Sequence, residues 1–552
     1  MVGDPGAQNA PSVTDEEPSV DTVGGRLPRA RGTGGDLDGR GAPRSVGRGV
    51  GRDQGTRGRA RPARPARPAF ERVPWFIFAA FFVVYGLISV LRYERRETMS
   101  WDLGIFTQAV YQYAHLKAPV VDIRGNGLNL LGDHFHPILA TIAPFFRVFP
   151  SPVTLLVAQA FLFAVAVVPI TRTSMALLGR RQGYAIGLAY GLAWGVVQAV
   201  NFDFHEIAFA SPLLAFSLCA YLRRDLGKAI AWALPLILVK EDIAPLACVI
   251  VALCAAECFP ERRIRALVIL AGCCAGGLAF LLLINVVIPH FNPRHVYLYW
   301  GKGGCVDPKL NNGVGKIISC VTSQELNGLG IKERTLVLLL LPTAFLALRS
   351  PLILLAVPEM FVVRFLTPDD HYWGTDWHYS AVPMTIAFVA AMDGLVRIRK
   401  ARESGRITPD EGSLLQKFGD IQLRHGAAAM FAIGLALSQE YSLQDLWKND
   451  TYKVSDRAHA IKHAEAFVPS GDGVTVETTL TMLAPMAART HTYWIGMNTP
   501  APPDYVIFDM GPSDWNGAGT PLAYVEQRHP GTTYAQIYAD NTFDVYVLHR
   551  TV

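Results

Sequence analysis

The sequence predicts a mainly α-helical, polytopic membrane protein of about eleven spans that ends in a small α/β domain. Hydrophobic residues make up 51% of the 552 residues, and charged residues only 18%. The apolar residues come in runs that approach the roughly 20 residues needed to cross ~30 Å of hydrocarbon. Basic and acidic segments alternate between these runs, and this alternation predicts the orientation of the spans.

Residues 1–72 are expected to form a disordered cytoplasmic tail. They are rich in Arg, Gly and Pro and contain no Lys, and their apolar content is too low to form a core. Such tails can bind acidic lipids or nucleic acid, but we expect a solvated tail that fixes orientation, with no nucleic-acid partner. No signal-peptide segment is recognisable near the start. The tail composition is typical of GC-rich bacteria, so we expect a multi-pass protein of the bacterial cytoplasmic (inner) membrane.

The transmembrane helical domain is expected over residues 73–442. Its predicted spans are Val73–Leu91, Pro152–Ile170, Gly183–Val200, Ile207–Leu222, Ala229–Val239, Ile243–Cys258, Ala266–Ile288, Thr335–Leu348, Leu352–Phe365, Tyr379–Leu395 and His425–Leu437. With the N-terminus cytoplasmic, every strongly basic short loop falls inside, and every acid- and His-rich segment falls outside. The least certain boundaries lie within residues 229–258.

The outer loop 92–137 is too long for a simple turn and is expected to carry a juxtamembrane helix. Residues Trp101–Leu116 place their apolar side chains on one face, which indicates an amphipathic helix along the outer surface. Asp102 lies at the start of this helix, where the helix dipole stabilises a carboxylate. A plain N-terminal cap is the alternative interpretation of Asp102.

Residues 443–552 are expected to form an extracytoplasmic α/β domain. The predicted strands are Val474–Thr479, Tyr505–Met510, Thr532–Tyr538 and Phe543–Leu548, and the predicted helices are Arg457–Phe467 and Leu480–Arg489. Catalytic signatures are weak in this region. A lid, an acceptor-binding module or a stabilising cap would each suit it.

Two of the eight cysteines are expected to form a disulfide. Six lie in apolar segments, where small hydrophobic residues are the simpler interpretation. Cys305 and Cys320 instead share one polar loop, and the predicted topology places that loop outside, where disulfides persist.

Acids and histidines gather at the outer ends of the predicted spans. The segments are Trp101-Asp102, Asp133-His134-Phe135-His136, Asp203-Phe204-His205-Glu206, Lys240-Glu241-Asp242 and Asp369-Asp370-His371. Ionisable groups at membrane depth are costly and usually functional, so their clustering on one side indicates a single outer site. A divalent metal is one expected cofactor of that site. Its candidate ligands are His134, His136, Asp203, His205 and Glu206, with an interfacial turn and helix capping as the alternatives.

Cationic groups in the same region favour an anionic ligand. Lys240, together with Glu241 and Asp242, interrupts a hydrophobic stretch in a way that packing does not explain. Arg364, near the outer end of its span, is a candidate for bidentate phosphate binding, with snorkelling to the interface as the alternative. A lipid-linked phosphate would suit such a pocket, with its head group at the site and its isoprenoid between spans.

At these residues the chain resembles a family of uncharacterised bacterial polytopic membrane proteins. The motifs that carry the resemblance are Trp101–Gln108 (WDLGIFTQ), Gly132–Pro137 (GDHFHP), Asp203–Glu206 (DFHE) and Lys240–Asp242 (KED). They occur in the expected order, and the resemblance covers about residues 73–550. The motifs are specific for the family but imply no reaction, because the family has none assigned.

The family is in turn similar in layout to the fold-C (GT-C) glycosyltransferases, which use polyprenyl-phosphate sugars. This similarity implies a catalytic acid in the first outer loop, and Asp102 occupies the matching place. The chain departs from the usual acidic pair, since Leu103 follows Asp102. Asp102 is then expected to be the general base that takes a proton from an acceptor hydroxyl.

The same resemblance implies the partners and the remaining site residues. A lipid-linked sugar would be the donor, an envelope glycan or lipid would be the acceptor, and membrane lipids would surround the protein. The expected substrate- and phosphate-binding residues are Lys240, Glu241, Asp242, Arg364 and Gln108.

Two other functions compete with glycosyl transfer. The chain could be a flippase or permease for a lipid-linked or anionic solute, but transporters hold their charged residues near the midplane on broken helices. Here the charges lie at one face, and no internal repeat is evident. A non-catalytic envelope scaffold that acts through the outer domain is the third class.

Overall fold

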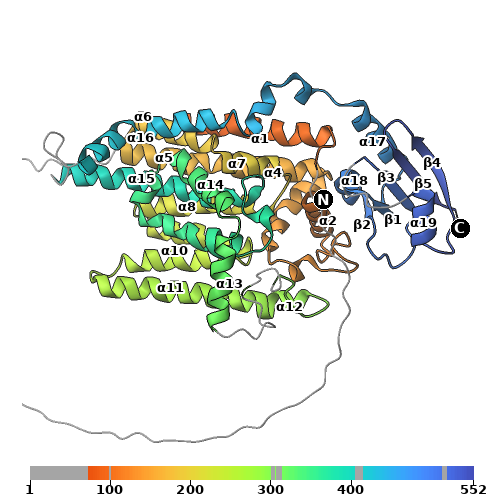
Figure 1. Ribbon diagram of the computed structural model, residues 1–552, viewed down its shortest axis with the longest axis horizontal. Coiled ribbons are helices and arrows are strands. Elements are labelled where there is room, and N and C mark those ends of the chain that lie inside the picture. The colour runs from red at the N-terminus through yellow and green to blue at the C-terminus, as the bar shows by residue number, and fades with distance from the viewer. Residues whose placement is uncertain are drawn as a thin grey trace, which may run out of the picture. The chain divides into compact units, whose positions relative to one another are not determined.

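The computed structural model describes residues 72–98, 101–299, 305, 314–404, 414–511 and 519–551. The chain divides into two compact units, Met1–Arg67 and Pro68–Val552. Every described residue belongs to the second unit, so the expected disordered tail lies outside the described residues, apart from Arg72. The second unit is mainly helical, with one small sheet near the C-terminal end of the chain (Figure 1).

Within the described residues, five helices are long and apolar enough to cross a membrane. They are Val73–Glu94 (α1), Pro152–Leu178 (α4, Pro152–Val165, with α5, Val167–Leu178), Arg180–Asn201 (α6, Arg180–Gly191, with α7, Trp194–Asn201), Arg262–Phe291 (α11, Arg262–Leu282, with α12, Ile288–Phe291) and His378–Glu403, which contains α15 (Ala381–Glu403). Four shorter apolar helices are Pro137–Val148, Glu206–Leu222, Leu226–Leu238 and Ala244–Ala256. The count of eleven spans therefore stays a prediction.

Two predicted spans are not continuous helices. Thr335–Leu348 begins within α14 (Leu329–Leu340) and continues as 3-10 turns, and Leu352–Phe365 consists of a 3-10 segment and the π-helical segment Pro358–Arg364. Prolines at positions 342, 351 and 358 explain the breaks, because proline removes a backbone donor and clashes with the preceding turn.

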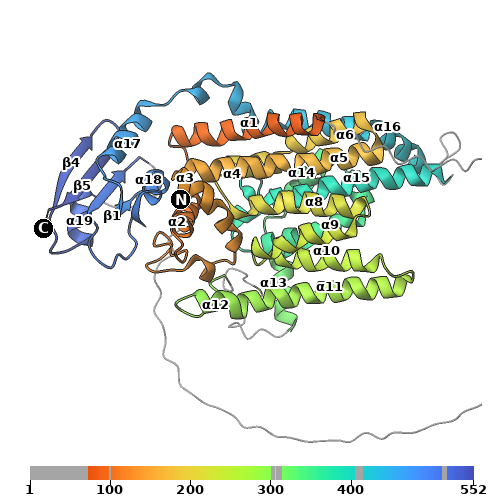
Figure 2. The same cartoon turned by 180° about the vertical axis from the view of Figure 1, so that it is seen from behind.

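Helix α15 lies at the centre of the helical part, and α1 and α11 lie at its edge. The span that contains α15 is 89% buried, whereas that of α11 is 22% buried. Helix α1 packs on α4, α6 packs on α16 (Leu414–Leu437), and α11 packs on α10 (Ala244–Ala256). Figures 1 and 2 draw these pairs side by side. The exposed faces of α1 and α11 carry large apolar side chains such as Phe76 and Leu267, as expected for contact with lipid.

The C-terminal sheet has five strands in the order β2-β1-β3-β5-β4. The strands are β1 (Gly471–Thr478), β2 (Thr490–Trp494), β3 (Tyr505–Asp509), β4 (Tyr534–Asp540) and β5 (Val545–Arg550). Strand β1 runs parallel to β2 and β3, and β5 runs antiparallel to β3 and β4. Helices α17 (Asp456–Ala466) and α18 (Leu480–Ala487) share one apolar core with the sheet, and α19 (Pro521–Arg528) contributes to another.

The four predicted strands and two predicted helices of this region are all present, with small shifts at their ends. The prediction missed β2 and α19. Strand β2 is only five residues long and begins directly after the predicted helix Leu480–Arg489. The start of α19 carries a recognisable signal, since the Thr520 hydroxyl accepts a hydrogen bond from Ala523 N and Pro521 occupies the first turn.

Helix α2 (Trp101–Ala114) is covered on nearly all sides, which corrects the expectation of an amphipathic surface helix. Residues 103–110 are buried without interruption. The cover comes from α18: a Cβ on Gly104 would lie 2.9 Å from the Leu483 side chain, so the two helices approach closely. The Arg96 guanidinium also donates to both carboxylate oxygens of Glu465 at 2.9 and 2.7 Å. The α/β part is thus fixed directly to the segment that carries Asp102.

Candidate functional site

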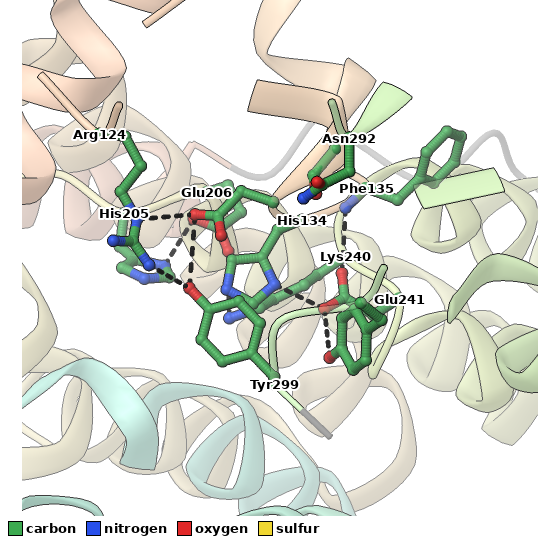
Figure 3. Close-up of polar contacts among 12 residues, drawn as sticks. Arg124, His134, Phe135, His205, Glu206, Lys240, Glu241, Asn292 and Tyr299 are labelled. Atoms are coloured by element: carbon green, nitrogen blue, oxygen red, sulfur yellow. Dashed lines mark hydrogen bonds and ion pairs between the residues drawn. The ribbon is translucent and has the colours of Figure 1, made fainter. Parts of the chain in front are cut away.

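Three of the five acid- and His-rich segments that the sequence singled out meet in one place. The segment at 133–136 precedes a 3-10 turn, that at 203–206 follows α7, and that at 240–242 precedes α10. The backbone of Asp203 has a φ of 76°, in the left-handed region that a non-glycine residue rarely occupies. Such strain persists where surrounding structure holds the chain, often at functional sites. Figure 3 shows the resulting cluster of side chains.

Glu241 is buried and is held by three donors from distant parts of the chain. His134 Nδ1 lies 2.5 Å from its Oε1, and the backbone N–H of Phe135 donates to its Oε2 at 3.0 Å (Figure 3). The Tyr297 hydroxyl donates to Oε1 at 3.1 Å. Burial disfavours the charged form of both His134 and Glu241. For each of them, the partner's opposite charge and hydrogen bond, together with other nearby groups, outweigh burial. Glu241 raises the pKa of His134, and His134 lowers the pKa of Glu241.

Glu206 is fully buried beside two cationic or basic groups. His205 Nδ1 lies 2.8 Å from its Oε2, and Lys240 Nζ lies 3.4 Å from its Oε1. Burial lowers the pKa of Lys240, but the carboxylates of Asp242, Glu206 and Glu241 outweigh it and raise that pKa well above its ordinary value. Lys240 is therefore a fixed positive charge in the cluster.

Three imidazoles pack around Phe106 and Glu206. The rings of His205 and His378 are stacked with centroids 3.6 Å apart, and Phe106 meets His205 and His136 edge-on at 5.5 and 5.7 Å. His136 Nδ1 is buried without a hydrogen-bond partner, and burial lowers the pKa of His136 to about 4. His136 is thus neutral at physiological pH and free to bind a polar group.

Asp133 is tied to a strap of chain at 292–299 that follows α12. Arg124 Nε donates to Asp133 at 3.1 Å, and the Tyr299 hydroxyl donates to it at 3.4 Å. The Tyr299 ring stacks on His134 at 4.3 Å. Asn292 Nδ2 donates to Gly132 O, and a Cβ on Gly132 would lie 2.6 Å from the strap backbone, which explains why glycine stands there.

Asp102 lies at the border of this cluster. It is one helical turn before Phe106, so both side chains fall on the same face of α2. It also lies close enough to the Tyr379 phenol to act on it electrostatically, and Tyr379 packs on His378 with ring centroids 4.2 Å apart. Asp102 is thus a neighbour of two aromatic side chains, Phe106 and Tyr379, and each of them leads by ring contacts to His205.

Two expected binding residues are engaged elsewhere. The buried guanidinium of Arg364 donates to Tyr372 O at 2.9 Å and to Gly374 O at 2.8 Å, which holds the loop beyond it and leaves no free fork for a phosphate. The Gln108 amide donates to Thr492 O and accepts from Ile123 N, so it fastens α2 to β2. The sequence could not show what their donors bind, because the acceptors come from other segments.

The five expected metal ligands are not gathered into one group of ligand atoms. Within the described parts of the chain, one set of three or more His, Cys, Asp or Glu side chains has ligand atoms within 4.8 Å of one another: Asp369, Asp370 and His371. That set is exposed. At the expected metal position, the Lys240 ammonium accompanies Glu206 and supplies the positive charge.

A large apolar cavity begins beside the cluster. Its volume is about 620 Å³, and its walls come mainly from α10, α11 and the segments 351–363. Its lining is mainly apolar, with Asp242 and Glu359 beside the cluster; the other charged residues of the lining are Arg224, Glu257, Asp393, Arg397 and Lys400. A smaller cavity of about 30 Å³ also includes Asp242 and Glu359, together with Lys240, His378 and Tyr379. The polar cluster and the apolar cavity therefore share a boundary.

The sequence analysis missed six contributors to this region, namely Arg124, Tyr297, Tyr299, Glu359, His378 and Tyr379. The two strap tyrosines had a signal as interfacial aromatics, but only their hydrogen bonds reveal their role. Glu359 had the clearer signal: it is an acid within a predicted span. The predicted disulfide partners Cys305 and Cys320 are joined in the structure, with Cα atoms 5.4 Å apart.

Comparison with known proteins gives a family match and several similar solved structures, which include an ArnT and an oligosaccharyltransferase. The family model described as "Predicted membrane protein (DUF2079)" matches residues 92–535. ArnT from Cupriavidus metallidurans in the apo state is 12% identical, with a TM-score of 0.46, covering 86% of this chain and 98% of its own. The Archaeoglobus fulgidus oligosaccharyltransferase in the apo form is 10% identical, with a TM-score of 0.29, covering 79% and 70%. No curated protein matches the sequence. Likeness at these TM-scores carries no argument about the reaction.

Proposed function

The chain belongs to the DUF2079 family of predicted membrane proteins, and we propose that it is a membrane glycosyltransferase. It would take a sugar from a polyprenyl phosphate at the extracytoplasmic face of the bacterial inner membrane and pass it to an envelope glycan or lipid. In this proposal the chain crosses the membrane about eleven times, with its N-terminus in the cytoplasm and residues 443–552 outside.

One observation carries this proposal: a cluster of acids, bases and a fixed cation adjoins an apolar cavity of about 620 Å³. A lipid-linked sugar needs both environments at once. Its polar head requires hydrogen-bonding and charged groups, and its isoprenoid requires a groove lined by side chains such as Leu246, Val249 and Phe280. A soluble substrate would have no use for the groove.

The residues of the cluster divide the chemistry between them. Asp102 is the proposed general base, because it borders the cluster from α2 and lies next to the α/β part that would present an acceptor. Lys240 is the proposed phosphate contact, because its partly buried ammonium lies at the small cavity beside the boundary. Glu241 and His134 hold the segment of Lys240 in place through their mutual contact. The reaction needs an oxocarbenium-like transition state, which the surrounding carboxylates stabilise.

The proposal is tested by incubating the purified protein in proteoliposomes with a panel of polyprenyl-phosphate sugars. Consumption of one lipid-linked sugar, with release of polyprenyl phosphate, is the expected result. If the wild-type protein consumes none of the panel while it binds the lipids, glycosyl transfer from this class of donor is excluded.

A further inference from the structure

Glu359 is an ionisable residue in an unusual place. It lies in the π-helical segment Pro358–Arg364, and its neighbours Phe361 and Val362 are exposed apolar side chains. π-Helical turns occur frequently at functional sites, and acids within membrane-embedded segments are usually functional. No hydrogen bond or ion pair of Glu359 is found among the residues that the structure describes. Packing alone gives no reason for this carboxylate.

Asp242 shares this position from another part of the chain. It precedes α10, and both Asp242 and Glu359 line the large apolar cavity and the small cavity at the cluster. Asp242 Oδ1 is buried and has no hydrogen-bond partner. The two carboxylates also lie close enough to interact electrostatically. They therefore form the boundary between the groove and the polar cluster.

The charged groups around this boundary determine whether Asp242 and Glu359 are protonated. Lys240, Glu206, Glu241 and His134 act on Asp242, and Arg364 and Lys240 act on Glu359. Tyr372, His378 and Tyr379 complete the small cavity. Lys240 Nζ lies 3.4 Å from Glu206 Oε1, and the Arg364 donors bind backbone carbonyls. Among the described residues, neither cation forms an ion pair with Asp242 or Glu359. Burial raises the pKa of Asp242; Lys240 opposes this effect and Glu241 adds to it, and the pKa of Asp242 stays above its ordinary value. In a poorly solvated site, the carboxyl groups of Asp242 and Glu359 cannot both be ionised.

We propose that Asp242 and Glu359 hold one proton between them and give it to the phosphate of the lipid-linked substrate as the glycosidic bond breaks. This inference rests on the proposed function. The bond between the anomeric carbon and the phosphate oxygen breaks, and its electron pair goes to that oxygen. The oxygen takes the proton of the carboxyl pair, while Asp102 takes the proton of the acceptor hydroxyl. The products are the glycosylated acceptor and polyprenyl hydrogen phosphate.

The pair also explains how an anionic lipid can enter a site rich in carboxylates. Two ionised carboxylates at the mouth of the groove would repel a phosphate. A shared proton turns one of them into a hydrogen-bond donor, and Lys240 supplies the positive charge next to it. The same proton is then in position for the leaving group.

A hydrophobic carbodiimide tests the proton directly and needs no substrate. Dicyclohexylcarbodiimide reacts with protonated carboxyl groups in apolar surroundings, and peptide mass spectrometry locates the adduct. Glu257 is the matched control: it lines the same cavity but pairs with Arg224 at 2.5 Å and accepts from the Tyr221 hydroxyl. At pH 7 we expect an adduct at Asp242 or Glu359 and none at Glu257. Labelling of neither acid, or equal labelling of Glu257, would overturn the inference.

A kinetic arm separates this inference from the proposed function. With the lipid-linked sugar that the wild-type protein consumes, the double variant Asp242→Asn/Glu359→Gln should have a kcat about 100-fold lower than that of the wild type. Its KM for the donor should change only a few-fold, because the amides still donate hydrogen bonds to a phosphate. Transfer at the full wild-type rate by this variant would remove the pair from the mechanism and leave glycosyl transfer standing. If the carbodiimide labels Asp242 or Glu359 but the protein consumes no donor, the two residues do share a proton. Their role in glycosyl transfer is then excluded.

Discussion

His134 Nδ1 lies 2.5 Å from Oε1 of Glu241, and this contact joins two segments that are 107 residues apart in the sequence. Tyr299 covers the His134 ring, and Tyr297 donates to the same carboxylate oxygen. The contact therefore fixes the loop 92–137, the segment before α10 and the strap at 292–299 to one another. It is the structural centre of the candidate site.

Removal of the charge in Glu241→Gln should destabilise the protein by on the order of 3 kcal/mol, because it leaves a buried partner unpaired. The effect should depend on pH. The raised pKa of His134 stabilises the fold below its ordinary value of 6.5, and this contribution is lost as pH rises through the raised pKa. The lowered pKa of Glu241 stabilises the fold above 4.5, and this contribution is lost as pH falls through the lowered pKa.

The difference in melting temperature between wild type and Glu241→Gln should thus be largest between pH 4.5 and 6.5 and shrink at alkaline pH. Differential scanning fluorimetry in detergent measures it. Glu97→Gln is the matched control, since Glu97 pairs with Arg95 on the exposed surface and should change little at any pH. If the difference in melting temperature does not change with pH, His134 and Glu241 do not form the ion pair described.

The α/β part should detach more easily when its buried ion pair to the helical part is broken. Glu465→Gln removes the carboxylate that accepts from Arg96, and both side chains are at most one-tenth exposed. We expect a loss of about 3 kcal/mol and faster tryptic release of residues 443–552. Lys462→Gln removes a more exposed pair with Glu94 across the same contact and should have a much smaller effect. Equal effects of the two variants would contradict the interface described.

The sequence was sufficient for the class, for four strands and two helices of the C-terminal part, and for the meeting of three acid and His segments, because hydrophobic runs and acids at span ends follow from the bilayer itself. It could not show what Arg364 and Gln108 bind, because that depends on carbonyls from other segments. It could not foresee the broken helices at 341–364 in detail, although their prolines were visible. Tyr297 and Tyr299 could not be assigned to Glu241 and Asp133, because no local pattern links residues this distant.

The disulfide gives a test of which side the loop 289–333 faces. Cys305 and Cys320 are joined, whereas Cys258, Cys273 and Cys274 are exposed thiols. In protein purified without reductant, maleimide should label the three free thiols at once and the joined pair only after reduction, as counted by mass spectrometry. Free Cys305 and Cys320 in protein taken from oxidising cells would place this loop on the reducing, cytoplasmic side.

Accessibility from each side separates transfer from transport. Single cysteines at the partly exposed positions 102, 134 and 299, in a background without free thiols, should react with a membrane-impermeant maleimide from the outside only. Positions 224 and 400, which line the large cavity, serve as controls for access from the cytoplasm. If the three site positions became reactive from the cytoplasmic side when substrate was added, alternating access would replace glycosyl transfer as the best account.

The most direct measurement compares release of polyprenyl phosphate by wild type and by Asp102→Asn, in proteoliposomes supplied with the consumed donor and its acceptor. Loss of the general base should lower kcat about 10²–10⁴-fold, while thermal stability and donor binding stay as in wild type. Asp472→Asn, which removes an exposed carboxylate on the α/β part, should release polyprenyl phosphate at the wild-type rate. Release by Asp102→Asn at the wild-type rate would contradict the claim that the outer cluster performs the transfer through Asp102.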